Sequence, residues 1–236
     1  MKSPTLLYNE GHGPLPTLLL GLTAVTGIVD AISILGLGRV FVANMTGNIV
    51  FIGLALAHAQ GFSLISSLFA LLGFLIGAAI GGKLIKKFGM DRAKLFSAAC
   101  IAEFTFIVIA LIVGLSVNNP TMGDSRYGLS VLLAIMMGIQ NAVVRKLAVP
   151  DMTTTVLTMT LTGIAADLRQ SGWRSMQLVR RLIAVLTMLV GALVGAKLVL
   201  NNSETLASAL VAVIILLVLL GALVSIHRPG KWRIGG

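Results

Sequence analysis

Two carboxylic acids stand inside long apolar stretches of this sequence, and they are its clearest candidates for chemistry. Asp30 follows the residues Gly-Leu-Thr-Ala-Val-Thr-Gly-Ile-Val, and Glu103 follows Ala-Ala-Cys-Ile-Ala. A carboxylate in such surroundings is costly unless it faces water, a partner or an ion, so both residues are candidate proton-relay groups. Each also has a structural explanation. Asp30 could accept hydrogen bonds at the start of a nearby short helix, and Glu103 could stay protonated and bond to a neighbouring helix.

Uncharged polar side chains gather in two short segments, at about 43–59 and 152–168, and the second is rich in threonine. Threonine, asparagine and exposed helix-end amides together suit a small polar or anionic solute. Alternatively, the hydroxyls could satisfy a neighbouring helix or their own backbone. With the polar residues of the adjoining apolar runs, the candidate solute-binding residues are Asp30, Asn44, Thr46, Gly47, Asn48, Gln140, Asn141, Thr155, Thr158 and Thr160. Asp151, after Pro150, is expected to cap a helix.

The composition decides the class of protein that carries these residues. Of 236 residues, 57% are hydrophobic and 11% are charged, with a mean hydropathy of +0.99. Soluble domains are about 45–50% apolar and about 25% charged, so an ordinary soluble enzyme, a disordered chain and a disulfide scaffold are excluded. Cys100 is the sole cysteine, and the three histidines lack metal-ligand spacing. We therefore expect no metal, no cofactor and no catalytic residue.

The sequence contains six long apolar runs, at about 15–37, 64–85, 95–116, 127–145, 179–200 and 206–226. Each approaches the roughly 20 residues that a helix needs to cross a bilayer. The first run is expected to be a retained span, because residues 1–16 do not have the pattern of a signal peptide. The two short polar segments are expected to be short spans or re-entrant half-helices.

The net charge of +10 comes from clusters of Lys and Arg between the apolar runs. Without a recognised binding module, this distribution argues against nucleic acid and for orientation in a membrane. If all eight segments crossed, the two sides would carry equal numbers of Lys and Arg. If the short segments re-enter instead, one side of the membrane carries every Lys and Arg except Arg39, Arg126 and Lys197. The second arrangement predicts six spans, two re-entrant segments and both termini in the cytoplasm.

An internal repeat relates the two halves of the chain. Residues 27–31 (Gly-Ile-Val-Asp-Ala) resemble residues 138–142 (Gly-Ile-Gln-Asn-Ala), and Thr-Gly-Asn at 46–48 corresponds to Thr-Met-Thr at 158–160. Residues 77–84 likewise resemble residues 191–198, so the offset stays between 111 and 114. Because each half holds three spans, the halves are expected to be inverted repeats, with the polar half-helices meeting between them. The predicted parts are a tail at 1–16, repeats at 17–118 and 125–226, and a basic tail at 227–236.

Small residues recur every four positions in the second long apolar run of each half. Gly73, Gly77 and Gly81 stand in the first half, and Gly191 and Gly195 in the second. Such spacing lets helices approach closely. It could serve packing between the repeats or the face of a homo-oligomer.

The motif Gly-x-x-Asp-Ala, followed by Phe41, Asn44 and Thr-Gly-Asn at 46–48, resembles the YoaK family of bacterial multi-pass membrane proteins. Residues 138–142 and the threonine-rich segment fit the same pattern. The resemblance covers nearly the whole chain, and it implies a membrane topology without an activity, since that family is of unknown function. One position departs from it, because the family's second Thr-Gly-Thr reads Thr-Met-Thr here. If the glycine of the family motif lets a ligand approach the backbone, the side chain of Met159 narrows this side of the site.

These features favour a multi-pass protein of the bacterial inner membrane that moves an unidentified small solute by alternating access or a gated pore. Movement could be linked to protons through Asp30. The expected partners are the lipid bilayer and that solute, with no nucleic acid. One alternative is a membrane-embedded enzyme acting on a lipid or quinone, which would need Asp30 and Glu103 to lie together. The other is a non-transporting assembly partner with a sealed interior.

Overall fold

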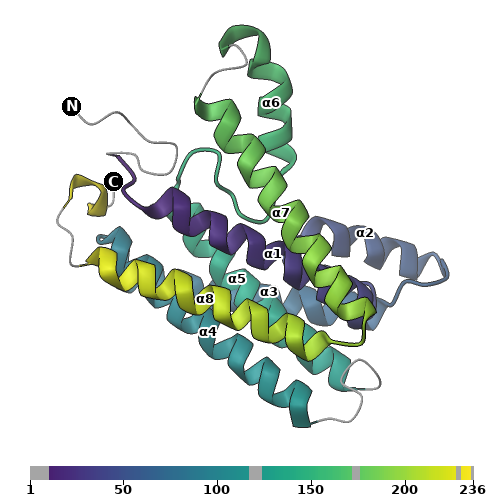
Figure 1. The fold of residues 1–236 in the computed structure, drawn as a ribbon. Coiled ribbons are helices and arrows are strands. Elements are labelled where there is room, and N and C mark those ends of the chain that lie inside the picture. The colour runs from purple at the N-terminus through teal and green to yellow at the C-terminus, as the bar shows by residue number, and fades with distance from the viewer. Residues whose placement is uncertain (1–10, 117–123, 172–175, 227–229, 235–236) are drawn as a thin grey trace.

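A computed structural model describes residues 11–116, 124–171, 176–226 and 230–234. Residues 1–10 of the predicted tail at 1–16, half of the predicted tail at 227–236, and residues 117–123 lie outside these residues. The described part folds into eight α-helices and a short 3-10 helix at Lys231–Arg233 (Figure 1). The helices are α1 (Leu15–Gly36), α2 (Met45–Leu56), α3 (Leu64–Phe88), α4 (Arg92–Ser116), α5 (Ser125–Leu147), α6 (Thr158–Ser171), α7 (Met176–Leu200) and α8 (Glu204–Ile226).

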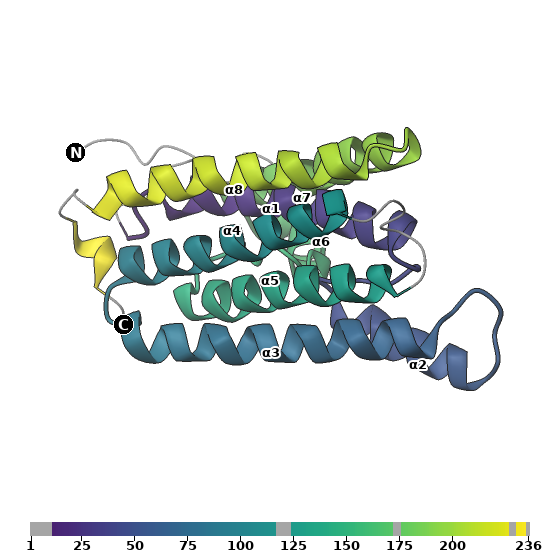
Figure 2. The same cartoon turned by 90° about the horizontal axis from the view of Figure 1, so that it is seen from below.

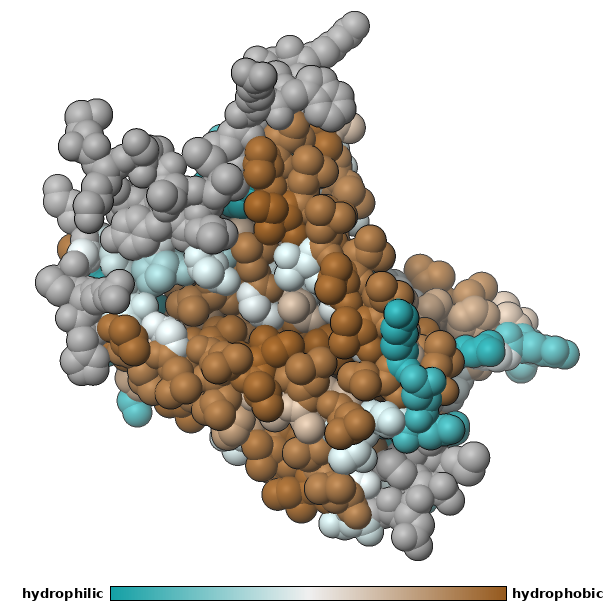
Figure 3. Space-filling model, in the orientation of Figure 1, coloured by the Kyte–Doolittle hydropathy of each residue, from teal (hydrophilic) through white to brown (hydrophobic). Residues whose placement is uncertain are grey.

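Six of these helices are long and apolar enough to cross a membrane: α1, α3, α4, α5, α7 and α8. They have 22 to 25 residues, which at about 1.5 Å per residue spans the roughly 30 Å of a hydrocarbon core. The six long helices predicted from the apolar runs are confirmed. Large apolar side chains cover much of their outer surface, as the brown face over α7 and α8 shows (Figure 3). A surface of this kind suits contact with lipid.

Local sequence explains where several helices begin and end. Ser63 accepts a 3.2 Å hydrogen bond from the backbone of Ser66 and so caps α3. Asp91 accepts from the backbone amides of Ala93 and Lys94 at the start of α4. The helix α5 stops at Ala148, whose φ of 46° lies in the left-handed region, two residues before a proline.

The centre of the bundle is formed by α1 and α5. In their most apolar windows, 67% of α1 and 61% of α5 are buried, against 22% to 33% in the other four spans. The view in Figure 2 shows α1 and α5 lying between the outer helices. Of the predicted site residues on these two helices, Asp30 and Gln140 are therefore shielded by the rest of the bundle, whereas Asn141 is partly exposed.

One end of the bundle, called here the basic end, gathers four segments around Arg92. The guanidinium donates to the backbone oxygens of Gly11, Leu147 and Trp232. The start of α1, the start of α4, and the chain after α5 and α8 therefore lie at the same end. Four other segments meet at the opposite end, where one small cavity is lined by Leu37, Gly114, Leu129 and Glu204.

The two short helices each leave the bundle and return at a single end. Arg39, which precedes α2, and Gly61, which follows it, are close neighbours. Gly38 lies beside Ser66 of α3. Before α6 and just inside α7, Asp151 and Arg181 form an ion pair of 2.7 Å. Thus α2 belongs to the opposite end and α6 to the basic end, which is the arrangement that the distribution of Lys and Arg favours.

Glycines hold the long helices in two close pairs, α1 with α7 and α3 with α5. A Cβ atom on Gly27 would overlap the backbone oxygen of Met188, and a Cβ atom on Gly138 would overlap that of Phe74. The two glycines lie 111 positions apart in the sequence, and the two residues whose carbonyl oxygens they contact lie 114 positions apart. The two pairs therefore make equivalent contacts, and each pair joins one helix from each half of the chain.

The glycines expected to serve packing or a homo-oligomer face are used within the chain. Gly73, Gly77 and Gly81 lie against α5, while Gly191 and Gly195 lie against α1, and all five are buried. A second copy cannot reach them without separating these helices. Within this chain the five glycines therefore serve packing between the halves, and a homo-oligomer stays a prediction.

Candidate functional site

Gln140 joins the two halves of the molecule at its centre. It is fully buried on α5, and its side-chain nitrogen donates to Thr26 of α1 at 3.1 Å and to Thr154 at 3.0 Å. Thr154 belongs to the segment that leads into α6. The side-chain oxygen of Gln140 is also buried and has no hydrogen-bond partner among the described residues. An unpaired buried acceptor costs about 1–3 kcal/mol, so this oxygen is a place where a ligand could bind.

Asp30 on α1 holds the segment that leads into α2. Its carboxylate lies close enough to the backbone amides of Val42 and Ala43 to be stabilised by them, and the residue is 8% exposed. This agrees with the structural role considered for Asp30, although the donors stand just before the helix rather than in its first turn. One carboxylate oxygen, Oδ1, has no hydrogen-bond partner among the described residues. Asp30 therefore combines a positioning contact with a spare acceptor.

Asn141 occupies the place in α5 that Asp30 occupies in α1. Its side-chain oxygen accepts a 2.7 Å hydrogen bond from the hydroxyl of Thr155, and its side-chain nitrogen donates to the backbone oxygen of Met137. Thr155 lies 111 positions after Asn44, at the entrance to the second short helix. The two residues thus perform the same task in both halves, and only Asp30 can carry a charge.

A cavity of about 350 Å³ lies beside Asn141, between α5 and the segment before α6. Its walls include Asn141, Arg145, Met152, Thr153 and Thr155. Of the predicted binding residues, Asn141 and Thr155 are therefore the two that line this space. Arg145 was not among them, although its position one helical turn after Asn141 could have indicated it.

Several predicted binding residues instead shape the start of α2. The fully buried side chain of Asn48 bonds to both the backbone nitrogen and oxygen of Phe41. The Phe41 ring lies directly against Gly47, where a Cβ atom would overlap it. Asn44 stands at the N-cap of α2 without a side-chain capping bond, and Thr46 is exposed. Gly47 therefore accommodates an aromatic ring.

The corresponding residues of α6 are also dispersed. Thr158 and Met159 are exposed, Met159 by 72%, whereas Thr160 is buried. Among the described residues, α2 contacts α3 and α6 contacts α7, but the two short helices do not contact each other. The expected meeting of these helices is therefore wrong. The link between the halves runs instead through Gln140, Thr26 and Thr154.

Glu103 is completely buried in α4, and neither of its carboxylate oxygens has a hydrogen-bond partner in the described part of the chain. Glu103 is accordingly not hydrogen-bonded to Asp30 of α1. Asp30 and Glu103 therefore do not form the acid–base pair that an embedded enzyme would need. Within the described residues, no group of three His, Cys, Asp or Glu side chains could hold a metal, and Cys100 is buried and free.

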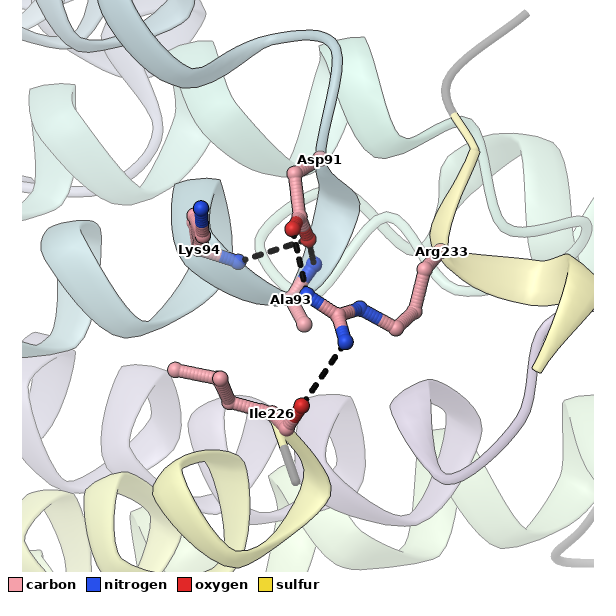
Figure 4. Close-up of polar contacts among 5 residues, drawn as sticks. All are labelled: Asp91, Ala93, Lys94, Ile226 and Arg233. Carbon is pink, nitrogen blue, oxygen red and sulfur yellow. Dashed lines mark hydrogen bonds and ion pairs between the residues drawn. The ribbon is translucent and has the colours of Figure 1, made fainter. Parts of the chain in front are cut away.

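Charged residues at the basic end form contacts that the sequence did not reveal. Arg233 donates to Asp91 and to the backbone oxygen of Ile226, which ties the chain after α8 to the start of α4 (Figure 4). Burial alone would raise the pKa of Asp91, but the Arg233 guanidinium and two backbone amides hold it below its usual value. Asp151, expected to cap a helix, is instead paired with Arg181.

A family model described as "Protein of unknown function (DUF1275)" matches residues 18–223, from the first turn of α1 to near the end of α8. The chain belongs to this family. It is also 33% identical over 189 residues to the UPF0700 transmembrane protein YoaK of Bacillus subtilis (strain 168), over 76% of this chain and 82% of that relative. The resemblance to the YoaK family seen in the motifs is confirmed. No solved structure matches the chain.

The match covers all eight helices of this YoaK-family chain. The relative is named a transmembrane protein, and the chain has six helices long and apolar enough to span a bilayer. It is therefore a multi-pass membrane protein. The positions that carried the resemblance, Gly27, Asp30, Asn48 and Gly138, all have structural contacts at the helix pairs or at the start of α2.

Proposed function

We propose that this protein is an inner-membrane transporter of a small solute, built from two inverted repeats with its site where α1 and α5 meet. The observation that carries the proposal is a pair of spare buried acceptors, Asp30 Oδ1 and Gln140 Oε1, on the two central helices. Buried polar atoms in a membrane protein are costly and favour a role in a solute pathway. No cofactor or catalytic step is part of this proposal.

The inverted arrangement is supported by the direction of the helices. The helix α1 starts at the basic end and α5 ends there, so the two equivalent helices run in opposite directions (Figures 1 and 2). The short helices likewise belong to opposite ends. With the basic end in the cytoplasm, this topology follows the positive-inside rule and puts both chain termini there.

The pairing of the helices suggests how such a transporter would move. Gly27 and Gly191 lock α1 to α7, and Gly77 and Gly138 lock α3 to α5, so each pair can move as one body. Between the pairs, the backbones of α1 and α5 approach each other at few places, and the hydrogen bond from Gln140 to Thr26 joins the two helices. Rocking of one pair against the other about this contact would expose the site to each side in turn.

Proton coupling would use the one difference between the equivalent residues. Asp30 can take up and release a proton, whereas Asn141 cannot. The carboxylate is stabilised by the backbone amides before α2, so a change of charge at Asp30 would alter how firmly that segment is held. This gives the proton a direct mechanical link to one short helix.

A flux assay tests the proposal. Purified protein is reconstituted into vesicles loaded with the pH dye pyranine and challenged with inorganic anions, small carboxylates, amino acids and polyols. We expect solute-dependent proton movement that Asp30→Asn abolishes, while the matched control Asp124→Asn, an exposed carboxylate before α5, leaves it unchanged. A solute that moves equally well with Asp30→Asn and Asn48→Ala would contradict this mechanism.

A second measurement separates a transporter from an assembly partner with a sealed interior. Gln140→Cys is introduced into a Cys100→Ala background, and small charged thiol reagents are added from each face of the membrane. A transporter predicts labelling from both faces, because its two states open the site alternately. A sealed interior predicts none from either face.

A further inference from the structure

A membrane-facing groove between α3 and α5 has the features of a lipid site. It has a volume of about 700 Å³ and runs along α3 from Phe74 to Ile85, with Asn141, Arg145 and Lys146 of α5 on its other wall. Both helices are candidate spans, so the groove opens toward the hydrocarbon of the bilayer.

The length of the groove corresponds to one leaflet. Eleven residues of helix separate Phe74 from Ile85, which is about 16 Å along the axis. Half of a hydrocarbon core of roughly 30 Å is about 15 Å. An acyl chain that lies along the groove would therefore begin at the basic end and finish near the middle of the membrane.

Cations lie where the lipid headgroup would be. Arg145 and Lys146 occupy the last turn of α5, both are exposed, and Arg145 has no hydrogen bond or ion pair with any described residue. The guanidinium offers five donors in a planar fork that suits a phosphate. The cavity beside Asn141 adjoins the groove at Asn141 and Arg145, which line both spaces.

The equivalent surface of the other half lacks these features. At the offset of 111, Arg145 and Lys146 correspond to Ile34 and Leu35. At the offset of 114, Gly82 of the groove corresponds to Ala196. A Cβ atom on Gly82 would meet nothing within 4 Å, so the missing side chain leaves the groove open. The cations and the open wall therefore occur together in only one half.

We propose that this groove binds an anionic phospholipid, with its phosphate at Arg145 and one acyl chain between α3 and α5. The positive charge favours an anionic headgroup over a zwitterionic one. The apolar, leaflet-length wall favours a lipid over a free anion. The inference does not depend on transport, since a protein with any membrane function could hold this lipid.

Lipid binding to the full-length protein in a neutral detergent can be measured by native mass spectrometry. The probes are phosphatidylglycerol and phosphatidylcholine with the same chains. We expect preferential binding of phosphatidylglycerol, an affinity about fivefold lower in Arg145→Gln, and loss of both lipids in Gly82→Leu, which fills the groove. Lys197→Gln, which removes an exposed cation of α7 near the opposite end, should bind phosphatidylglycerol as the wild type does.

Glycerol phosphate serves as the soluble arm of the same experiment. It should not displace phosphatidylglycerol, because it lacks the chains that occupy the groove. Equal binding of the two lipids, wild-type binding in both Arg145→Gln and Gly82→Leu, or displacement by glycerol phosphate would overturn the proposal. The thermal unfolding of each variant, followed by the reactivity of buried Cys100, verifies that the variants are folded.

Discussion

The side-chain amide of Gln140 donates a 3.1 Å hydrogen bond to the hydroxyl of Thr26, across 114 positions of sequence. It is the central polar link between the two halves, and it lies where the two glycine-locked helix pairs meet. Its strength therefore affects both the stability of the bundle and the freedom of the pairs to move.

Removing this link should destabilise the protein moderately. Thr26→Val deletes the acceptor and should lower the free energy of unfolding by about 1 kcal/mol, whereas Gln140→Leu also leaves Thr154 without its partner and should cost more. Unfolding in detergent can be followed with a thiol-reactive dye, because Cys100 is the single cysteine and is buried. Strict additivity in the double variant would show that the two side chains do not interact.

Equivalent glycines should respond equally to substitution. Gly27→Ala and Gly138→Ala each force a methyl group onto a backbone carbonyl and should lower stability by about 1–3 kcal/mol. Gly53→Ala is the control, since a Cβ atom there meets nothing within 4 Å and alanine favours a helix. The same dye assay compares the three variants. A large loss at one of the paired glycines and none at the other would argue against equivalent contacts.

His12 should make the stability of the basic end depend on pH. Burial lowers the pKa of His12, and the nearby guanidinium groups of Arg92 and Arg180 lower it further. The folded protein therefore keeps the ring neutral at a pH where the unfolded chain already protonates it. Its contribution to stability is complete above about pH 6.5 and is lost as the pH falls from there toward the lower folded value.

The substitution His12→Gln tests this dependence, because glutamine offers an acceptor to Arg92 but does not titrate in this range. Unfolding midpoints measured from pH 7.5 to pH 5 should fall less steeply in the variant than in the wild type. Identical slopes for the two proteins would mean that His12 does not contribute.

Asp91 and Arg233 should secure the chain after α8. Because the pKa of Asp91 is held below its usual value, its contribution is present above about pH 4 and is lost as the pH falls through the folded value. Limited proteolysis should cut the C-terminal segment faster in Asp91→Asn than in the wild type at neutral pH. Lys94→Gln, which removes a neighbouring exposed charge, is the control. The prediction is contradicted if both variants are cut at the wild-type rate.

The spans and short helices could be predicted because their signals are local. A run of about 20 apolar residues predicts a spanning helix by itself, and the distribution of Lys and Arg favours re-entry of the two short segments. The role of Asp30 near the start of α2 was also open to prediction. A buried carboxylate needs hydrogen-bond donors, and the helix that carries Asp30 ends a few residues later, just before α2. The repeat offset then led from Asp30 to Asn141.

The contacts of Arg92 could not be predicted in the same way. Its partners are backbone oxygens of Gly11, Leu147 and Trp232, and a backbone oxygen has no signature in the sequence. The exposure of Thr158 was also not evident from the sequence, because a threonine in a polar segment can face either the bundle or the outside. Which side of this short helix faces the bundle follows from its contact with α7, which is distant from Thr158 in the sequence and leaves no local pattern.

Cysteine accessibility on the two faces of the membrane tests the central claim, that the halves are inverted and the short helices enter from opposite sides. Single cysteines replace Arg39 and Gln60 around α2, and Pro150 and Gln177 around α6, in a Cys100→Ala background. An impermeant thiol reagent should label positions 39 and 60 from the periplasmic face alone, and positions 150 and 177 from the cytoplasmic face alone. Labelling of the two positions around either short helix from different faces, or of all four from the same face, would contradict the account.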